Sequence, residues 1–241
     1  MIQLHPAVSD SDNSGSLPVL RLIRYLPAFS LPFCLAFATL AQTPPRHDTQ
    51  FWNETQMIAP INKKAELVLS GGLRFGREIS RPVDERLGVG IAFKPNRHFT
   101  IQPHYLYIAQ QPSAGRKVFE HRLNLDVTGR IFPGRFTISD RTRIERRVRL
   151  SSRDFTVWRN RLQIEHPARL GSFKFKPFVA NEVFYDSSAS RWTRNRFSIG
   201  CSKEFSPRFT GEFYYLRQND GRARPGNLHV IGTAFRIRLR N

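Results

Sequence analysis

The sequence is poor in cysteine, which limits the chemistry that it can support. Only Cys34 and Cys201 occur in 241 residues. Cys34 lies in an N-terminal apolar stretch, and its removal with that stretch would leave one thiol. A single thiol excludes an intrachain disulfide and a metal cluster built on thiolates. We therefore expect no metal site and no cofactor.

Acidic residues are also scarce: 19 Asp and Glu stand against 38 Lys and Arg, giving a formal net charge of +19. With a mean hydropathy of −0.42, this charge taken alone favours a soluble nucleic-acid-binding protein. However, aromatic residues make up 12% and hydrophobic residues 40% of the chain. That much apolar surface must be buried or covered, which argues against intrinsic disorder.

The N-terminus has the layout of a secretory signal peptide. Arg21 and Arg24 precede an apolar run over residues 25–41, and small residues suited to signal peptidase stand at its end. A membrane-anchoring helix is the alternative, but the run is short and is interrupted by Pro27 and Pro32. The sequence thus predicts three parts: a leader and cleaved signal peptide over residues 1–41, a short periplasmic linker over 42–50, and one folded domain over 51–241.

Beyond residue 51 the hydrophobic residues recur with period two, which predicts strands. Leu123, Leu125 and Val127, for example, alternate with Arg122 and Asp126. About eleven such segments follow, most of them of the length that a tilted membrane-crossing strand needs, about 9–11 residues, whereas strands of globular proteins average about 5–6. We therefore predict an all-β protein, a transmembrane antiparallel up-and-down β-barrel of 10–12 strands. Bacterial barrels normally have an even number of strands, so eleven is an unexpected number.

The segments between the strands predict two different rims. Short turns alternate with longer polar loops, the pattern of outer-membrane barrels; we expect the short turns to face the periplasm. The longer loops are expected at residues 77–84, 110–118, 148–155, 187–191 and 219–227. Aromatic residues near strand ends predict the girdles that mark the two membrane interfaces: Trp52, Tyr107, Trp158, Tyr185 and Trp192.

The two faces of the strands differ sharply: one is apolar and the other is rich in arginine. A water-soluble β-sandwich with a polar exterior is the alternative. Like-charged columns over many strands would have no reason to persist there, whereas in a lumen neighbouring carboxylates can pair with them. The candidate lumen-lining residues are Arg74, Arg86, Arg122, Arg130, Arg141, Arg143, Arg159, Arg161, Arg194, Arg196, Arg236 and Arg238.

A few polar residues fall on the face expected to meet lipid, where unpaired polar groups are costly. They are His121, Asp140, Asn160, Asn181 and Asn195. A register error or a local bulge explains them most simply. The sharper hypothesis is an outward-facing hydrolytic site acting on lipid, with His121 as its candidate, but no serine accompanies it. We therefore assign no catalytic residue.

The chain resembles the bacterial family called domain of unknown function 2490, whose members are expected to be outer-membrane barrels. The resemblance lies in the opening strand Phe51-Trp52-Asn53-Glu54, an immediate hairpin into Glu66–Phe75, and the later strand Arg122–Leu125. It covers roughly residues 49–241 and implies a barrel in the bacterial outer membrane. It implies no activity.

Three functions follow as hypotheses. The first is an anion-selective pore with an arginine-lined lumen; a closed structural barrel, in which acidic side chains neutralise the arginines, is its alternative. The second is an outer-membrane enzyme acting on lipid or lipopolysaccharide. The third, a nucleic-acid binder, is disfavoured because the aromatic residues lie on the opposite strand face from the arginines. Expected partners are outer-membrane lipid and lipopolysaccharide, the barrel-assembly machinery during insertion, and anionic solutes.

Overall fold

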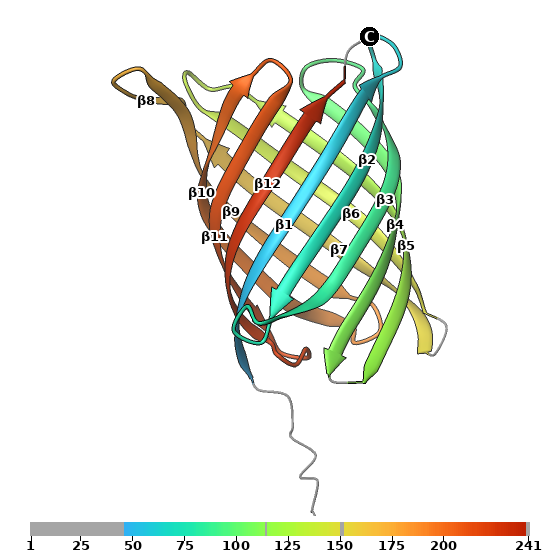
Figure 1. Cartoon of the computed structure of the whole chain (residues 1–241). Helices are drawn as coiled ribbons and strands as arrows, with labels where there is room; N and C mark the ends of the chain where they lie inside the picture. The colour runs from blue at the N-terminus through green and yellow to red at the C-terminus, as the bar shows by residue number, and fades with distance from the viewer. Residues whose placement is uncertain (1–45, 114, 150–151, 240–241) are drawn as a thin grey trace, which may run out of the picture. The chain divides into compact units, whose positions relative to one another are not determined.

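The described part of the computed structural model (residues 46–113, 115–149 and 152–239) is a closed ring of tilted strands without a helix (Figure 1). The leader over residues 1–41, with Cys34, lies outside the described residues. Eleven strands form the ring, and the three-residue β8 pairs only with β9. The strands are β1 (His47–Pro60), β2 (Ala65–Gly76), β3 (Arg81–Phe93), β4 (Phe99–Ser113), β5 (Arg116–Ile131), β6 (Thr137–Arg149), β7 (Ser152–Glu165), β8 (Ala168–Leu170), β9 (Phe173–Asp186), β10 (Arg191–Ser206), β11 (Phe209–Asp220) and β12 (Asn227–Arg238).

The predicted β-barrel of 10–12 strands is confirmed, with one difference at its seam. Neighbouring strands pair antiparallel around the ring, but β1 and β12 pair in parallel, from His47 opposite Asn227 to Ile58 opposite Arg238. An odd number of alternating strands brings the first and last strands together in the same direction, so the expectation of an antiparallel barrel throughout was wrong at this pair. The seam also uses residues 47–50, which the sequence analysis placed in a linker: β1 begins at His47 because those residues pair with β12.

The expected contrast between short turns and long loops is not found. We call the rim at which β12 ends the C-terminal rim and the rim at which β1 begins the N-terminal rim. At the N-terminal rim, β3 begins at Arg81 after β2 ends at Gly76, and only residues 221–226 separate β11 from β12. Connections at the C-terminal rim have similar lengths, such as 94–98 and 132–136. Many residues assigned to long loops belong to strands instead: β4 extends to Ser113, β5 begins at Arg116 and β7 begins at Ser152.

The outward face is apolar over most of the ring. Leu87, Leu123 and Phe213 are 67%, 59% and 58% exposed, which is the exposure expected of side chains that contact lipid. The outward residues of β2 from Leu67 to Phe75, of β3 from Leu87 to Phe93 and of β5 from Leu123 to Ile131 are all Leu, Val, Ile, Phe or Gly. An apolar surface of this extent is unusual on a water-soluble protein and is what a bilayer covers.

Aromatic residues on the outer face form a girdle near the N-terminal rim. Trp158 and Trp192 are 47% and 63% exposed, and the ring of Trp192 meets that of Tyr185 edge-on at 5.5 Å. Trp52, which was also placed in a girdle, points the other way: it is 2% exposed and lies inside the ring. Its parity explains the error, since Trp52 shares a strand face with the buried Gln50 and with Glu54, not with Phe51.

The described residues contain no helix that is long and apolar enough to cross a bilayer.

An arginine placed on the outer face should destabilise the barrel, whereas one on the inner face should not. Leu69 and Ser70 are neighbours near the middle of β2; Leu69 is 44% exposed on the outer face and Ser70 lines the interior. We expect Leu69→Arg to lower the free energy of unfolding by about 2–4 kcal/mol, the cost of a cation at the bilayer midplane. Denaturant unfolding in lipid vesicles measures this, with Ser70→Arg as the matched control. Equal losses in both variants would contradict the assignment of the two faces.

Candidate functional site

The candidate site is the interior of the ring, where residues of the described chain line two cavities. The first, of about 590 Å³, extends from mid-barrel to the C-terminal rim. Eleven basic and six acidic side chains line it, so its wall carries excess positive charge. Ten of the twelve arginines proposed from the sequence lie there: Arg74, Arg86, Arg130, Arg141, Arg143, Arg159, Arg161, Arg196, Arg236 and Arg238.

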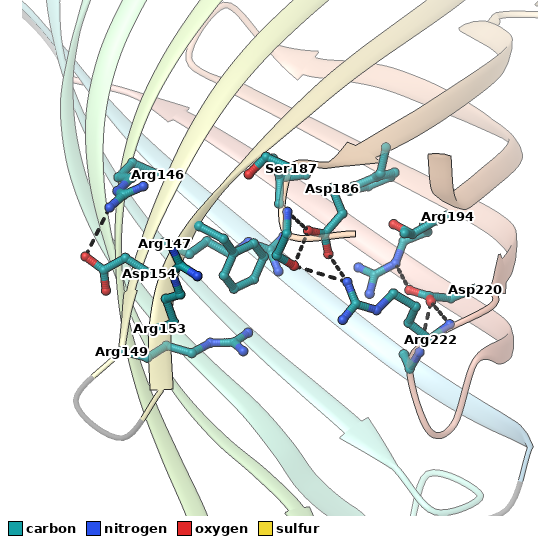
Figure 2. Close-up of a pocket in the computed structure, with 16 residues that line it drawn as sticks. Arg146, Arg147, Arg149, Arg153, Asp154, Asp186, Ser187, Arg194, Asp220 and Arg222 are labelled. Carbon is teal, nitrogen blue, oxygen red and sulfur yellow. Dashed lines mark hydrogen bonds and ion pairs between the residues drawn. The ribbon is translucent and has the colours of Figure 1, made fainter. Parts of the chain in front are cut away.

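The second cavity, of about 670 Å³, lies at the N-terminal rim (Figure 2). Its lining includes Arg194, which donates to Asp220 at 2.5 Å. Arg222 donates to Asp186 at 3.1 Å and so joins the β11–β12 connection to the end of β9. Ser188 accepts a second hydrogen bond from the same guanidinium nitrogen at 3.1 Å. These contacts join the β9–β10 and β11–β12 connections, both of which contribute to the lining of this cavity.

A belt of ion pairs lies between the two cavities, which have no lining residue in common. Seven arginines and four carboxylates form one connected network. We call this set the arginine belt: Arg122, Arg141, Arg143, Arg147, Arg149, Arg159, Arg196, Glu120, Asp126, Glu145 and Glu182.

The centre of the belt is Glu145, whose side chain is fully buried. It accepts from Arg147 at 2.6 Å and from Arg159 at 3.0 Å, and it forms an ion pair with Arg122 at 3.3 Å. Glu120, which is also fully buried, accepts from Arg122 and Arg149. Both carboxylates are buried away from solvent, so their hydrogen bonds come from guanidinium groups. Such charge-assisted bonds are strong.

Glu182 and Asp126 extend the belt toward the larger cavity. Glu182 accepts from Arg159 and Arg141, each at 2.8 Å. Asp126 accepts two bonds from Arg143, at 2.5 and 2.7 Å, in a bidentate pair. The number of arginines exceeds the number of carboxylates, so the belt keeps net positive charge after every carboxylate has been paired.

The strand period explains why these groups meet. Residues two apart on a strand share a face, which places Arg122 beside Glu120 on β5 and Arg147 beside Glu145 on β6. Residues opposite each other on neighbouring strands also share a face, and this register sets Arg143 opposite Asp126. Sequence reasoning anticipated the cross-strand pairs but missed Glu120, Arg147 and Arg149. Their parity with Arg122 and Glu145 was the available signal.

Two arginines in the larger cavity pair with no carboxylate of the described residues. Arg130 donates to the Thr100 hydroxyl at 3.0 Å, and Arg161 donates to Gln163 at 2.7 Å. Both therefore present charge to the cavity. Of the other two proposed arginines, Arg122 lies within the belt and Arg194 at the N-terminal cavity.

One sector of the inner wall is apolar, which the sequence analysis did not foresee. Trp52, Leu216, Leu228 and Val230 pack together on β1, β11 and β12, with Tyr214 against them. The guanidinium of Arg74 lies 3.5 Å from the centre of the Trp52 ring, and cation–π contact of this kind holds an arginine in place.

The polar outward residues do not form a hydrolytic site. His121 accepts or donates one hydrogen bond with the Tyr105 hydroxyl at 2.6 Å, and in the described chain it bonds to no serine and no carboxylate. Asp140 lies opposite Gly129 and Leu162, not near His121. No group of three His, Cys, Asp or Glu suited to a metal occurs within residues 46–113, 115–149 and 152–239.

The fold and its interior define a closed β-barrel of the outer-membrane type, and comparison with known proteins gives its family. The chain belongs to the family described as "Protein of unknown function (DUF2490)", which matches residues 49–228. The resemblance inferred from the opening strand and the Arg122–Leu125 strand is thereby confirmed. Among curated proteins, none matches the chain.

Several solved barrels are distantly similar. A structure titled "NanC porin structure in rhombohedral crystal form" has a TM-score of 0.44 at 14% identity, covering 79% of this chain and 96% of that one. One titled "KdgM porin" has a TM-score of 0.40 at 12% identity, covering 73% and 92%. An anion-selective porin from Comamonas acidovorans has a TM-score of 0.35 at 10% identity, covering 70% and 55%. The assignment of the fold rests on the strand pairing itself.

Removing the charge of Glu145 should destabilise the barrel strongly, because three guanidinium groups would lose a buried partner. We expect Glu145→Gln to lower the free energy of unfolding by about 3–5 kcal/mol. The matched control is Glu212→Gln, whose partner Arg236 is half exposed at 3.0 Å; about 1 kcal/mol or less is expected there. Urea unfolding in detergent compares the two, and a Glu145 variant no weaker than the control would show that the belt does not stabilise the fold.

Proposed function

We propose that the protein is an anion-selective pore of the bacterial outer membrane. The observation that supports this best is the excess of guanidinium groups inside the ring: eleven basic against six acidic side chains at the larger cavity, and seven arginines against four carboxylates in the belt. A wall of this charge lowers the energy of an anion and raises that of a cation.

The proposed solutes are small anions that carry carboxylate or phosphate groups. Guanidinium groups bind both in a bidentate manner, and unlike lysine they keep their charge under all physiological conditions. We expect Arg130 and Arg161 to bind such an anion most readily, because neither is paired with a carboxylate in the described chain. The arginine belt is the proposed constriction.

A closed structural barrel is the second candidate, and one observation favours it. The two cavities share no lining residue, and fully buried carboxylates lie between them. In a small barrel, side chains can fill the interior. This alternative makes the opposite prediction for ion conduction, so one measurement separates the two.

We further propose that the apolar outer face contacts outer-membrane lipid and lipopolysaccharide, and that the barrel-assembly machinery inserts the chain. The exposed leucines and the Trp158–Tyr185–Trp192 girdle support a bilayer as the surroundings. Fractionation of membranes, followed by a gel that detects heat-dependent unfolding, tests the location.

Planar-bilayer recording tests the pore. We expect a small single-channel conductance and a reversal potential, in a KCl gradient, that reports preference for chloride. In Arg161→Gln the preference for chloride over potassium should fall about tenfold. A unit charge about 6 Å from the ion path stabilises an anion by about 0.7 kcal/mol and destabilises a cation by the same amount at the dielectric constant of water.

The matched control is Arg217→Gln, since Arg217 shares the outer strand face with Phe213, contacts His229 at 2.6 Å and lines neither cavity. It should leave the reversal potential unchanged. Absence of current would favour the closed barrel, and preference for potassium would contradict the proposed selectivity.

A further inference from the structure

Two neighbouring groups of polar side chains interrupt the apolar outer face, one on β6 and β7 and the other on β9 and β10. We call them together the polar flank: Asp140, Thr142, Asn160, Asn181 and Asn195. The outward residues of β2, β3 and β5 at comparable positions are all apolar. Asn53 and Thr233 are also polar and outward, at the β1–β12 seam, but they are joined to each other by a hydrogen bond of 2.9 Å.

The polar flank lies within the membrane-spanning part of the strands. Asn160 is two residues from Trp158 of the girdle, and Asp140 is four residues from Phe136, which is 48% exposed at the C-terminal rim. Aromatic residues therefore bound the flank on both sides. A carboxylate and three amides at this depth would contact acyl chains, where unsatisfied polar groups are costly.

The members of the polar flank satisfy one another only in part. The Asn160 amide donates to Asp140 at 2.6 Å and to Thr142 at 3.3 Å, and the Asn195 amide donates to Asn181 at 3.0 Å. Within the described chain, the second carboxylate oxygen of Asp140 and the amide nitrogen of Asn181 make no hydrogen bond. The flank thus keeps a free acceptor on Asp140 and a free donor on Asn181. Both residues lie opposite Leu162, one on each neighbouring strand.

We propose that the polar flank is the interface of a homodimer, formed with a second copy of this chain about a two-fold axis along the membrane normal. Such an axis keeps each residue at the same depth, so the flank of one copy meets that of the other, and an isologous interface needs a self-complementary surface. The free acceptor of Asp140 and the free donor of Asn181 provide that complementarity. Contact with the apolar outer residues of β2, β3 and β5 in a second copy would instead leave the Asp140 carboxylate against leucines.

Two copies in this arrangement remove the polar groups from lipid and allow hydrogen bonds that one copy cannot complete. The apolar outward residues Leu162 and Phe197, which are 44% and 47% exposed and lie among the polar groups, would pack at the same contact. The inference requires the barrel to lie in a bilayer but does not depend on whether its lumen conducts.

The mass of the full-length protein in lipid nanodiscs and in mild detergent, measured by light scattering, tests the proposal. We expect a dimer for the unmodified chain. The double variant Asn160→Leu/Asn181→Leu should associate at least about tenfold more weakly, equivalent to 1.4 kcal/mol, while keeping heat-dependent mobility on a gel as proof that it has folded. Asn53→Leu is the matched control, because Asn53 also lies on the outer face and donates to Thr233 at 2.9 Å; it should remain dimeric.

Cysteine cross-linking gives a second reading that does not depend on stability. The axis that brings Asp140 of one copy to Asn181 of the other passes at Leu162, which lies opposite both residues. In a Cys201→Ser background, Leu162→Cys should therefore form a covalent dimer under mild oxidation, and Asn53→Cys should not. A monomer at every protein concentration would overturn the proposal, as would a leucine variant that still dimerises. Equal cross-linking from Asn53→Cys would show that contact between copies is not specific to the polar flank.

Discussion

The requirement that every backbone N–H and C=O be satisfied without water governs this structure. In a bilayer an open sheet edge is excluded, so the chain must close on itself. Closure is made by β1 and β12 along twelve residue pairs, from His47 opposite Asn227 to Ile58 opposite Arg238. The seam places the aromatic Trp52 beside Leu228 and Val230 on the inner wall. The parallel direction of the seam follows from the odd number of strands and not from any special residue.

Closure also encloses a row of arginines, and the energetics of the interior follow from that. A buried guanidinium needs a partner, and a buried carboxylate such as Glu145 or Glu120 needs several. The network therefore condenses where carboxylates are available, at the middle of the ring, and leaves arginines such as Arg161 unpaired toward the C-terminal rim. The same charges that stabilise the centre of the barrel thus divide its interior into two chambers. The stability of the centre and the excess of positive charge around it are two results of one composition.

Much of this could be read from the sequence, because a period of two assigns every side chain to a face. It placed Leu123 and Leu125 outside and gave a strand number that includes the observed eleven. The prediction that Trp52 belongs to an outer girdle was wrong, because the aromatic type was given more weight than its parity with Gln50 and Glu54. The predicted lengths of the connections were wrong because polar residues near 110–118 and 148–155 were assigned to loops. In a barrel, strand residues that face the lumen are also polar. The eleven segments counted in the sequence already implied a parallel seam, but the usual even number of bacterial barrels was given more weight than the count. The partners of Glu145 required the register between β6 and β7, which turns fix only after folding.

The parallel seam has a topological consequence for the two ends of the folded region. Because β1 starts at one rim and β12 finishes at the other, His47 and Arg238 lie on opposite sides of the ring. A short peptide could not join them, as it can in a barrel with an even number of strands, so circular permutation would need a linker that traverses the full height of the wall. Reporter groups attached next to these two residues would be exposed to different aqueous compartments. A reagent that does not cross the membrane would therefore reach only one of them from each side.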